Sequence, residues 1–272
     1  SMEPFRALVA DLLPSEQRTT GFAIQSFFIG TGAIIASALP YIFTNFFNIK
    51  NTAPEGQIPD SVIYSFYIGA FAFITAVSWT VIKTKENPPD NIEEFKRNLL
   101  KNSGLFNGIK EIFNSFFNMP KTMVQLAFVQ FFSWFALFAM WIYTTPAVTQ
   151  HIYGTNDPTS ELYNKGANWV GVLFSIYNGF AAVMAFLIIW IANKTSRKTV
   201  HSISLIFGGI GLASFYFIKD PNLLLISELG IGLAWSSILA MPYAILAGSL
   251  PAEKMGVYMG IFNFFIVIPQ IT

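Results

Sequence analysis

Long stretches without a charged residue constrain this chain more than any other feature of its sequence. A helix needs about 20 apolar residues to cross a hydrocarbon core of about 30 Å, and six runs reach that length, one of them interrupted only by Glu228. Because backbone groups in lipid must hydrogen-bond internally, we predict that each run is an α-helix and that the chain is an all-α membrane protein. The runs are Thr19–Ile49, Ser61–Ile82, Thr122–Gln150, Gly166–Asn193, Thr199–Ile218 and Asn222–Ala252, and a seventh starts at Met255.

The composition excludes several classes of function. Only 11% of the residues are charged, against about 25% in soluble domains. The net charge of +1 argues against a nucleic-acid partner, which needs a concentrated basic face. There is no cysteine, and His151 and His201 lie far apart in the sequence, so we expect no disulfide, no metal site and no bound cofactor.

The segments between the runs alternate between basic and nearly neutral. Arg18, the stretch 83–121 and the segment 193–198 are basic, whereas each intervening segment has one lysine, namely Lys50, Lys165 or Lys219. Basic loops stay in the cytoplasm. We therefore expect a multi-pass protein of the cytoplasmic (inner) membrane, surrounded by the lipid bilayer, with loop 83–121 on the cytoplasmic side.

The basic stretch 83–121 contains an amphipathic pattern. Apolar side chains recur at helical spacing from Phe106 to Phe116, with Lys110 and Glu111 on the other side. This pattern indicates either a helix lying in the membrane interface or a helix that caps the cytoplasmic face of a bundle.

The two ends of the chain resemble each other. Residues 14–29 and residues 251–266 both read as a cytoplasmic turn followed by a new helix in the same orientation. Parallel repeats of six helices are the plan of the major facilitator superfamily. On that plan the chain runs from the end of helix 4 to the start of helix 11, so that 1–82 belongs to the N-terminal half, 83–121 is a cytoplasmic linker and 122–272 belongs to the C-terminal half.

The segment between the expected helices 8 and 9 resembles the loop motif of that superfamily. Asn193 stands where the motif has aspartate, and Ser196 stands where it has glycine. The resemblance makes Asn193, Lys194, Arg197 and Lys198 structural motif residues.

Three further segments are similar to plant-type sucrose transporters. They are the arginine-bearing segment Pro4–Leu12, the aromatic segment Phe131–Tyr143 and the segment Phe262–Gln270. The resemblance implies a glycoside–cation symporter, with a sugar as its substrate and H⁺ or Na⁺ as its coupling ion, and a carrier that acts as a monomer when complete. The chain departs from the plant members at Thr144 and Thr145, where they have acidic residues.

That departure leaves a second transporter hypothesis, a uniporter or exporter of another small solute. A membrane-embedded enzyme is a third hypothesis, but such enzymes need clustered catalytic side chains near one membrane face. No such cluster occurs in the sequence, so we expect no enzymatic activity.

A polar and aromatic stripe in the run 122–150 is the best candidate for a sugar site. Gln130, Trp134, Leu137, Trp141 and Thr145 recur every three or four residues and so share one helix face. Sugars present apolar C–H faces and polar rims, and aromatic rings with an amide can bind both. Packing between helices is the alternative, with Trp141 in the aromatic belt at the interface.

Charged and amide side chains complete the set of candidates. The family resemblance places Arg6 inside helix 4, where its guanidinium can bind a sugar hydroxyl pair, and makes Asp11 a structural partner at the loop. Glu228 lies well inside a predicted span, which makes it a candidate for ion coupling. Asn178 and Asn263 are secondary candidates for hydrogen-bonding the substrate.

Overall fold

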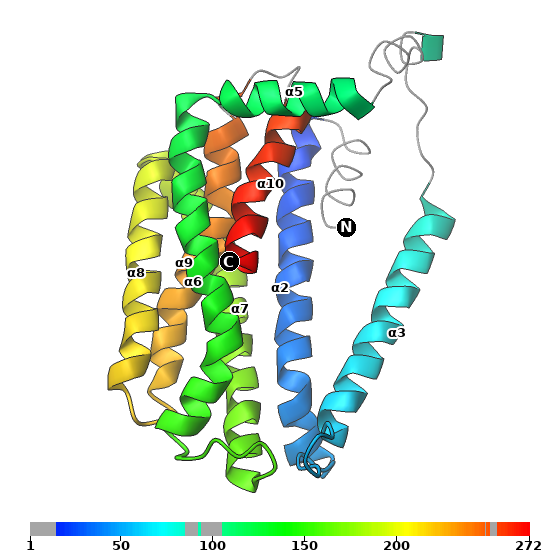
Figure 1. The fold of residues 1–272 in the computed structure, drawn as a ribbon, viewed down its shortest axis with the longest axis vertical. Coiled ribbons are helices and arrows are strands. Elements are labelled where there is room, and N and C mark those ends of the chain that lie inside the picture. The colour runs from blue at the N-terminus through cyan, green and yellow to red at the C-terminus, as the bar shows by residue number, and fades with distance from the viewer. Residues whose placement is uncertain (1–14, 85–91, 94–104, 248, 251–254) are drawn as a thin grey trace. The chain divides into compact units, whose positions relative to one another are not determined.

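Every regular element in the described part of the chain is an α-helix. A computed structural model describes residues 15–84, 92–93, 105–247, 249–250 and 255–272 (Figure 1). Six helices are long and apolar enough to cross a membrane, which confirms the predicted multi-pass architecture. The helices are α2 (Ser15–Phe46), α3 (Asp60–Lys83), α5 (Leu105–Phe117), α6 (Lys121–His151), α7 (Glu161–Lys194), α8 (Arg197–Phe217), α9 (Leu224–Ala247) and α10 (Met255–Ile271).

Serine side chains start two of the spanning helices. The Ser160 hydroxyl accepts a hydrogen bond from the Tyr163 backbone N–H at 3.2 Å at the start of α7. The Ser196 hydroxyl accepts one from the Thr199 backbone N–H at 3.0 Å at the start of α8. Each bond satisfies one of the N–H groups that a helix start leaves without a partner. Ser160 and Ser196 therefore serve as helix caps.

The chain packs as two compact units. One contains residues 1–83 and 139–241, and the other contains residues 84–138 and 242–272. Helices α6 and α9 contribute residues to both units, because the units divide at 138/139 within α6 and at 241/242 within α9. The assignment of 1–82, 83–121 and 122–272 to the halves and linker of a carrier stays a prediction.

Within the first unit, α2 and α7 form a close contact that we call the α2–α7 seam (Figure 1). The Asn168 amide donates to the Thr44 hydroxyl at 3.0 Å, and the Ser175 hydroxyl lies 3.1 Å from the Ile34 carbonyl oxygen. A Cβ added at Gly171 would come within 2.5 Å of the Ser37 carbonyl oxygen. Small and polar residues therefore let the two backbones approach closely, as interfaces between membrane helices require. The seam comprises the facing pairs Gly30–Ala182, Ile34–Ser175, Ser37–Gly171 and Thr44–Asn168.

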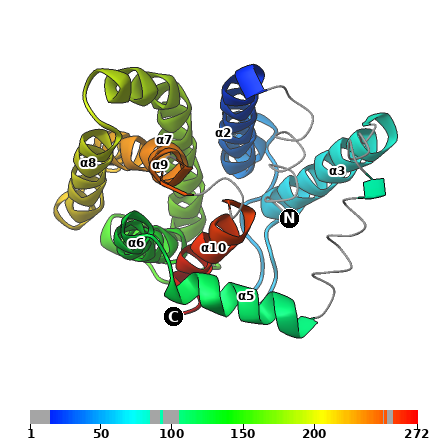
Figure 2. The same cartoon turned by 90° about the horizontal axis from the view of Figure 1, so that it is seen from above.

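Helices α7, α8 and α9 also pack through small residues, and Figure 2 shows them side by side. A Cβ added at Gly211 would lie 2.6 Å from the Ser227 carbonyl oxygen, and one added at Gly232 would lie 2.6 Å from the Tyr177 carbonyl oxygen. At the end where α8 joins α9, the indole N–H of Trp169 donates to the Pro221 carbonyl oxygen at 2.9 Å. The α8–α9 turn is thereby bonded to α7.

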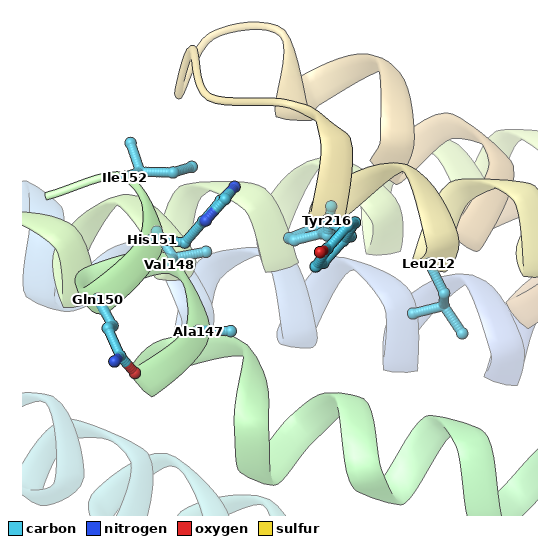
Figure 3. A pocket seen from close by; sticks show the side chains of 8 residues that line it. Ala147, Val148, Gln150, His151, Ile152, Leu212 and Tyr216 are labelled. Carbon is cyan, nitrogen blue, oxygen red and sulfur yellow. The ribbon is translucent and has the colours of Figure 1, made fainter. Parts of the chain in front are cut away.

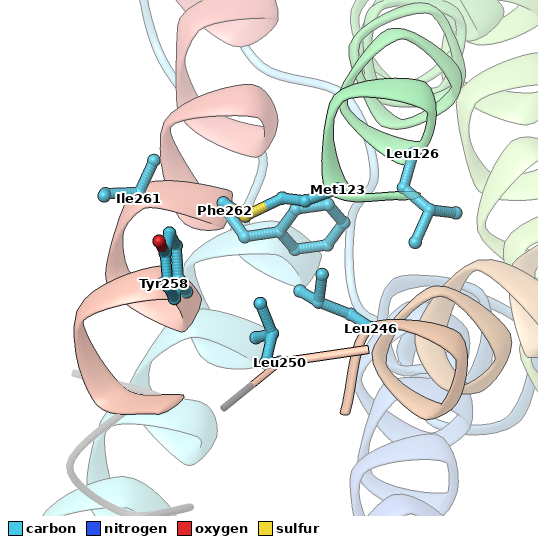
Figure 4. Packing of buried hydrophobic residues seen from close by; sticks show 7 residues of the cluster. All are labelled: Met123, Leu126, Leu246, Leu250, Tyr258, Ile261 and Phe262. Atoms are coloured by element: carbon cyan, nitrogen blue, oxygen red, sulfur yellow. The ribbon is translucent and has the colours of Figure 1, made fainter. Parts of the chain in front are cut away.

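The second unit is held by large apolar side chains (Figure 4). Phe262 of α10 and Met123 of α6 are fully buried at its centre. We call this group the Met123–Phe262 cluster, and it comprises Met123, Leu126, Leu246, Leu250, Tyr258, Ile261 and Phe262.

The amphipathic pattern in the basic stretch forms the predicted helix, α5. Phe116 packs against the Met123–Phe262 cluster and stacks on Phe265 of α10, with ring centroids 6.3 Å apart. Ile112, Phe113 and Phe117 are exposed. The apolar face of α5 thus packs on its own unit through Phe116, while its other apolar side chains stay exposed, as in a helix that places apolar side chains in the membrane interface.

Candidate functional site

Gln130, the first residue of the predicted stripe, is fully buried in α6. Within the described part of the chain, neither its amide nitrogen nor its amide oxygen has a hydrogen-bond partner. A buried amide without partners is costly, and such groups are uncommon in native proteins. A sugar hydroxyl pair would supply the missing donor and acceptor, which keeps Gln130 a candidate for binding the substrate.

Trp141, the fourth residue of the stripe, contacts aromatic side chains of two other helices in the first unit. Its indole N–H donates to the Tyr177 hydroxyl of α7 at 3.0 Å. Its ring meets Trp235 of α9 edge to face, with centroids 5.6 Å apart and planes at 90°. Three helices therefore place flat apolar faces and a phenol hydroxyl around one point, the combination that a sugar ring requires.

Glu228 of α9 is linked electrostatically to Tyr177, one of these residues. Glu228, Gly232 and Trp235 share one face of the helix, and Gly232 contacts the backbone at Tyr177. The Glu228 carboxyl lies within electrostatic range of the Tyr177 phenol. We call Trp141, Tyr177, Glu228 and Trp235 the aromatic–acidic cluster.

The burial of Glu228 is complete, and neither carboxyl oxygen has a hydrogen-bond partner among the described residues. A buried charge without a partner is strongly unfavourable. A proton, a cation, a water molecule or a substrate hydroxyl would each satisfy this carboxyl. Because α9 begins at Leu224, the carboxyl-bearing residue lies about 6 Å into the helix at 1.5 Å per residue.

Asn178 is buried, but it lies on a different face of α7 from Tyr177. Its position matches the spacing of Gly171, Ser175 and Ala182, the residues that form the α2–α7 seam. Its amide N–H donates to the Phe174 carbonyl oxygen of the same helix at 2.8 Å. Asn178 therefore lies at the seam, while its side chain also interacts with Tyr177 of the aromatic–acidic cluster, and its role in binding substrate stays a prediction.

The other predicted residues lie elsewhere in the chain. Trp134 and Asn263 are half-buried in α6 and α10 and belong, with Gln130, to the second unit. Arg6 and Asp11 lie outside the described residues. The predicted motif residues are exposed at the end of α7 (Asn193 and Lys194) and at the start of α8 (Arg197 and Lys198).

An open pocket lies between the ends of α6 and α8 (Figure 3). Ala147, Val148, Leu212 and neighbouring side chains line it, and the rings of His151 and Tyr216 stack with centroids 6.4 Å apart. None of the predicted substrate or ion residues lines this pocket, so it is separate from the aromatic–acidic cluster.

Metal ligands do not gather anywhere in the described part of the chain. No group of three histidine, aspartate or glutamate side chains there is placed to hold a metal ion. His201 instead lies buried between α8 and α9, where its Nδ1 is 2.9 Å from the Ser237 hydroxyl.

Tyr177 and Trp235 are the cluster members that sequence reasoning did not select. Trp235 could have been found, because it lies seven residues from Glu228 on the same helix face. For Tyr177 there was no such sign in the sequence. Because α7 is apolar on both its lipid-facing and its protein-facing side, its pattern does not show that Tyr177 faces other helices.

Comparison with known proteins agrees with this architecture. The family profile of the Major Facilitator Superfamily matches residues 2–271. Sucrose transport protein SUT1 from Oryza sativa subsp. japonica and its counterpart from subsp. indica are both 28% identical over 194 residues, which cover 59% of this chain and 35% of those proteins. The chain thus aligns with about a third of the length of these relatives. Since the family profile covers nearly the whole chain and the helices fit a multi-pass protein, the chain belongs to the major facilitator superfamily.

Proposed function

We propose that this chain carries substrate- and ion-binding residues of a secondary transporter that moves a glycoside by alternating access, coupled to H⁺ or Na⁺. The observation that carries the proposal is Glu228, a fully buried carboxyl without a hydrogen-bond partner among the described residues, which acts electrostatically on Tyr177 and shares a helix face with Trp235. An intramembrane carboxyl of this kind is a default site for a coupling ion. The intact carrier works as a monomer in the cytoplasmic membrane, with loop 83–121 on the cytoplasmic side.

The sugar is supported by two independent arguments. The aromatic faces of Trp141 and Trp235 suit the apolar C–H faces of a pyranose, and the Tyr177 hydroxyl beside them suits its hydroxyl groups. The relatives that align with the chain are named as sucrose transport proteins.

Thr144 bears on the coupling ion. It stands in the region where plant sucrose transporters have acidic residues, and its hydroxyl donates to the Met140 carbonyl oxygen at 2.6 Å. A threonine hydroxyl does not exchange a proton near physiological pH, with or without this bond. We therefore assign binding of the coupling ion to Glu228. If Glu228 does not bind this ion, the alternative is a uniporter without ion coupling.

Transport by the intact protein in proteoliposomes tests the proposal. Counterflow measures exchange of labelled sucrose or maltose without a driving force, and uptake under an imposed H⁺ or Na⁺ gradient measures coupling. We expect Glu228→Gln to abolish gradient-driven uptake while counterflow continues. Glu161→Gln, the same change at the exposed start of α7, should leave both unchanged.

The outcomes separate the hypotheses. Gradient-driven uptake that survives in Glu228→Gln would remove Glu228 as the coupling residue. Counterflow without any response to a gradient in the unmodified protein would favour the uniporter. No counterflow of either sugar, with the protein folded, would reject a disaccharide as the substrate.

Arg6 provides a second test, which rests on the family resemblance. We expect Arg6→Lys to abolish uptake without loss of folded protein, because lysine cannot form the paired hydrogen bonds of a guanidinium. Normal uptake by Arg6→Lys would exclude Arg6 from the substrate site.

A further inference from the structure

A second pocket lies between two loops of the first unit. The loops are residues 47–59, which join α2 to α3, and residues 152–160, which join α6 to α7, and both lie at the same end of the helices (Figure 1). On the predicted orientation, with loop 83–121 in the cytoplasm, this end faces away from the cytoplasm. The pocket has a volume of about 520 Å³, within the range of small-molecule sites. We call it the outer pocket, and it is lined by Lys50, Thr52, Ala53, Pro54, Gln57, Ile58, Asp60 and Thr159.

Backbone hydrogen bonds hold the α2–α3 loop in shape. The Ser61 backbone N–H donates to the Lys50 carbonyl oxygen at 3.2 Å, which joins the two ends of the loop. The Gln57 backbone N–H donates to the Pro54 carbonyl oxygen at 3.0 Å, and Gly56 between them has a φ of 79°, in the left-handed region that favours glycine. A pocket whose lining is already ordered loses little entropy when it binds a ligand.

The α6–α7 loop holds Thr159 in place on the other side of the pocket. One carboxylate oxygen of Asp157 accepts two hydrogen bonds, from the Thr159 backbone N–H at 2.9 Å and from the Thr159 hydroxyl at 2.7 Å. Because the hydroxyl proton is engaged in this way, the Thr159 oxygen offers the pocket a hydrogen-bond acceptor.

The lining of the outer pocket provides donors and acceptors but has no net charge of its own. Lys50 contributes an ammonium group and Asp60 a carboxylate, so a ligand ion of either sign would meet a like charge there. The Gln57 amide can both donate and accept. A neutral molecule with many hydroxyl groups can bond to all three side chains, and the apolar side chains of Pro54 and Ile58 can contact its C–H faces.

We propose that the outer pocket binds a neutral sugar on the outer side of the membrane, as a second site in addition to the aromatic–acidic cluster. The choice of a sugar among neutral polyhydroxyl compounds rests on the proposed function, whereas the pocket and its neutral polar lining do not. No residue of the aromatic–acidic cluster lines the outer pocket, so a sugar can occupy one site independently of the other.

Protection of an introduced cysteine from a thiol reagent tests the site in proteoliposomes of the intact protein. Ala53→Cys places a thiol in the lining, and Asn156→Cys places one at an exposed position of the other loop that does not line the pocket. A membrane-impermeant maleimide labels both variants, and mass spectrometry of the peptide that contains the changed position measures the extent of labelling. We expect sucrose or maltose at about ten times its dissociation constant to slow labelling at position 53 about tenfold. Labelling at position 156 should not change.

Two variants in the Ala53→Cys protein separate the outer pocket from an effect of the sugar elsewhere. Lys50→Met/Gln57→Met removes an ammonium and an amide at exposed positions with little change in side-chain length, and it should abolish protection by sugar. Its labelling without sugar should stay unchanged, which shows that the loop retains its structure. Glu228→Gln should retain protection, because Glu228 does not line the outer pocket.

Four results would overturn the proposal. They are equal labelling of position 53 with and without either sugar, equal protection of positions 53 and 156, protection that survives in Lys50→Met/Gln57→Met, and protection by sulfate as strong as that by sucrose, which would show an anion site.

Counterflow in the same proteoliposomes distinguishes this proposal from the proposed function. Counterflow without protection would reject the outer pocket and leave the proposed function standing. Protection without counterflow would support the outer pocket and reject transport of these sugars.

Discussion

The α2–α7 seam and the Met123–Phe262 cluster are both buried contacts between apolar helices, and they are built from opposite kinds of side chain. The seam uses Gly171, Ser175 and Asn168, with hydrogen bonds to the partner helix. The cluster uses Phe262, Met123 and other large apolar side chains that interdigitate.

The difference matters for movement. When a seam of small polar residues opens, each exposed hydroxyl or amide can hydrogen-bond to water in a transport cavity. When a cluster of large apolar side chains opens, it loses many van der Waals contacts and gains nothing from water. On the predicted numbering, the seam joins the two halves of a carrier, whereas the cluster lies inside one half. The comparison therefore predicts that the seam opens during transport and that the cluster stays closed.

Cross-linking tests this prediction most directly and should have the largest effect. The chain has no cysteine, so the variant Thr44→Cys/Asn168→Cys can be bridged selectively by a short, reducible thiol reagent. We expect uptake by the cross-linked protein to fall to background and to return after reduction. In the control variant Phe116→Cys/Phe265→Cys, which replaces two stacked rings in the second unit, cross-linking should leave uptake intact. Continued uptake across a bridged seam would show that the seam does not open.

Truncation of the cluster should cost the most stability. Phe262→Ala leaves a large cavity in a fully buried site, and we expect a loss of about 3–5 kcal/mol in the free energy of unfolding. Phe264→Ala, two residues along α10 and 47% exposed, should change it little. Denaturation in detergent measures both variants, and equal losses would mean that the cluster is not a packed core.

Adding a methyl group to the seam should have an intermediate effect. The Cβ of Gly171→Ala would lie 2.5 Å from the Ser37 carbonyl oxygen, which belongs to the backbone and cannot rotate away. We expect a loss of about 1–3 kcal/mol from overpacking. A Cβ at Gly209 of α8 would have no atom within 4 Å, so Gly209→Ala should be neutral or slightly stabilising. A stable Gly171→Ala protein would mean that the seam already tolerates separation of its helices.

The hydrogen bond between Asn168 and Thr44 should have the smallest effect. A double-mutant cycle with Asn168→Ala and Thr44→Val isolates its contribution to the free energy of unfolding. We expect a coupling of about 0.6 kcal/mol, the average for such bonds between membrane helices. A coupling energy of zero would mean that backbone packing alone holds the seam.

The spanning helices could be predicted from the sequence because charged side chains are costly in the hydrocarbon core, so that each span appears as a run without charges. The charge-free run Thr122–Gln150 became α6 (Lys121–His151), and the run Ser61–Ile82 became α3 (Asp60–Lys83). The amphipathic helix in the basic stretch was also predicted, because water contacts one of its sides and the pattern is therefore visible.

The neighbours of each helix could not be predicted from the sequence. Both the lipid-facing and the protein-facing sides of a spanning helix are apolar, so spacing alone does not say which helix lies beside it. Asn178 illustrates this: the sequence marked its amide as a candidate for binding substrate but gave no sign that its position on α7 matches the α2–α7 seam. Tyr177 was missed for the same reason, since its role depends on Trp141 and Glu228, which come from two other helices.

The hydrogen bond from Trp169 to Pro221 has a mechanical consequence. It fastens the α8–α9 turn to α7, and the glycine contacts along α8 and α9 leave no slack between those two helices. A force that pulls on the C-terminal end of the chain would therefore act on an α8–α9 hairpin whose turn is held to α7 by this hydrogen bond. Pulled by a cantilever, α8 and α9 should leave the bilayer together as one force peak, and Trp169→Phe should let them yield at a lower force.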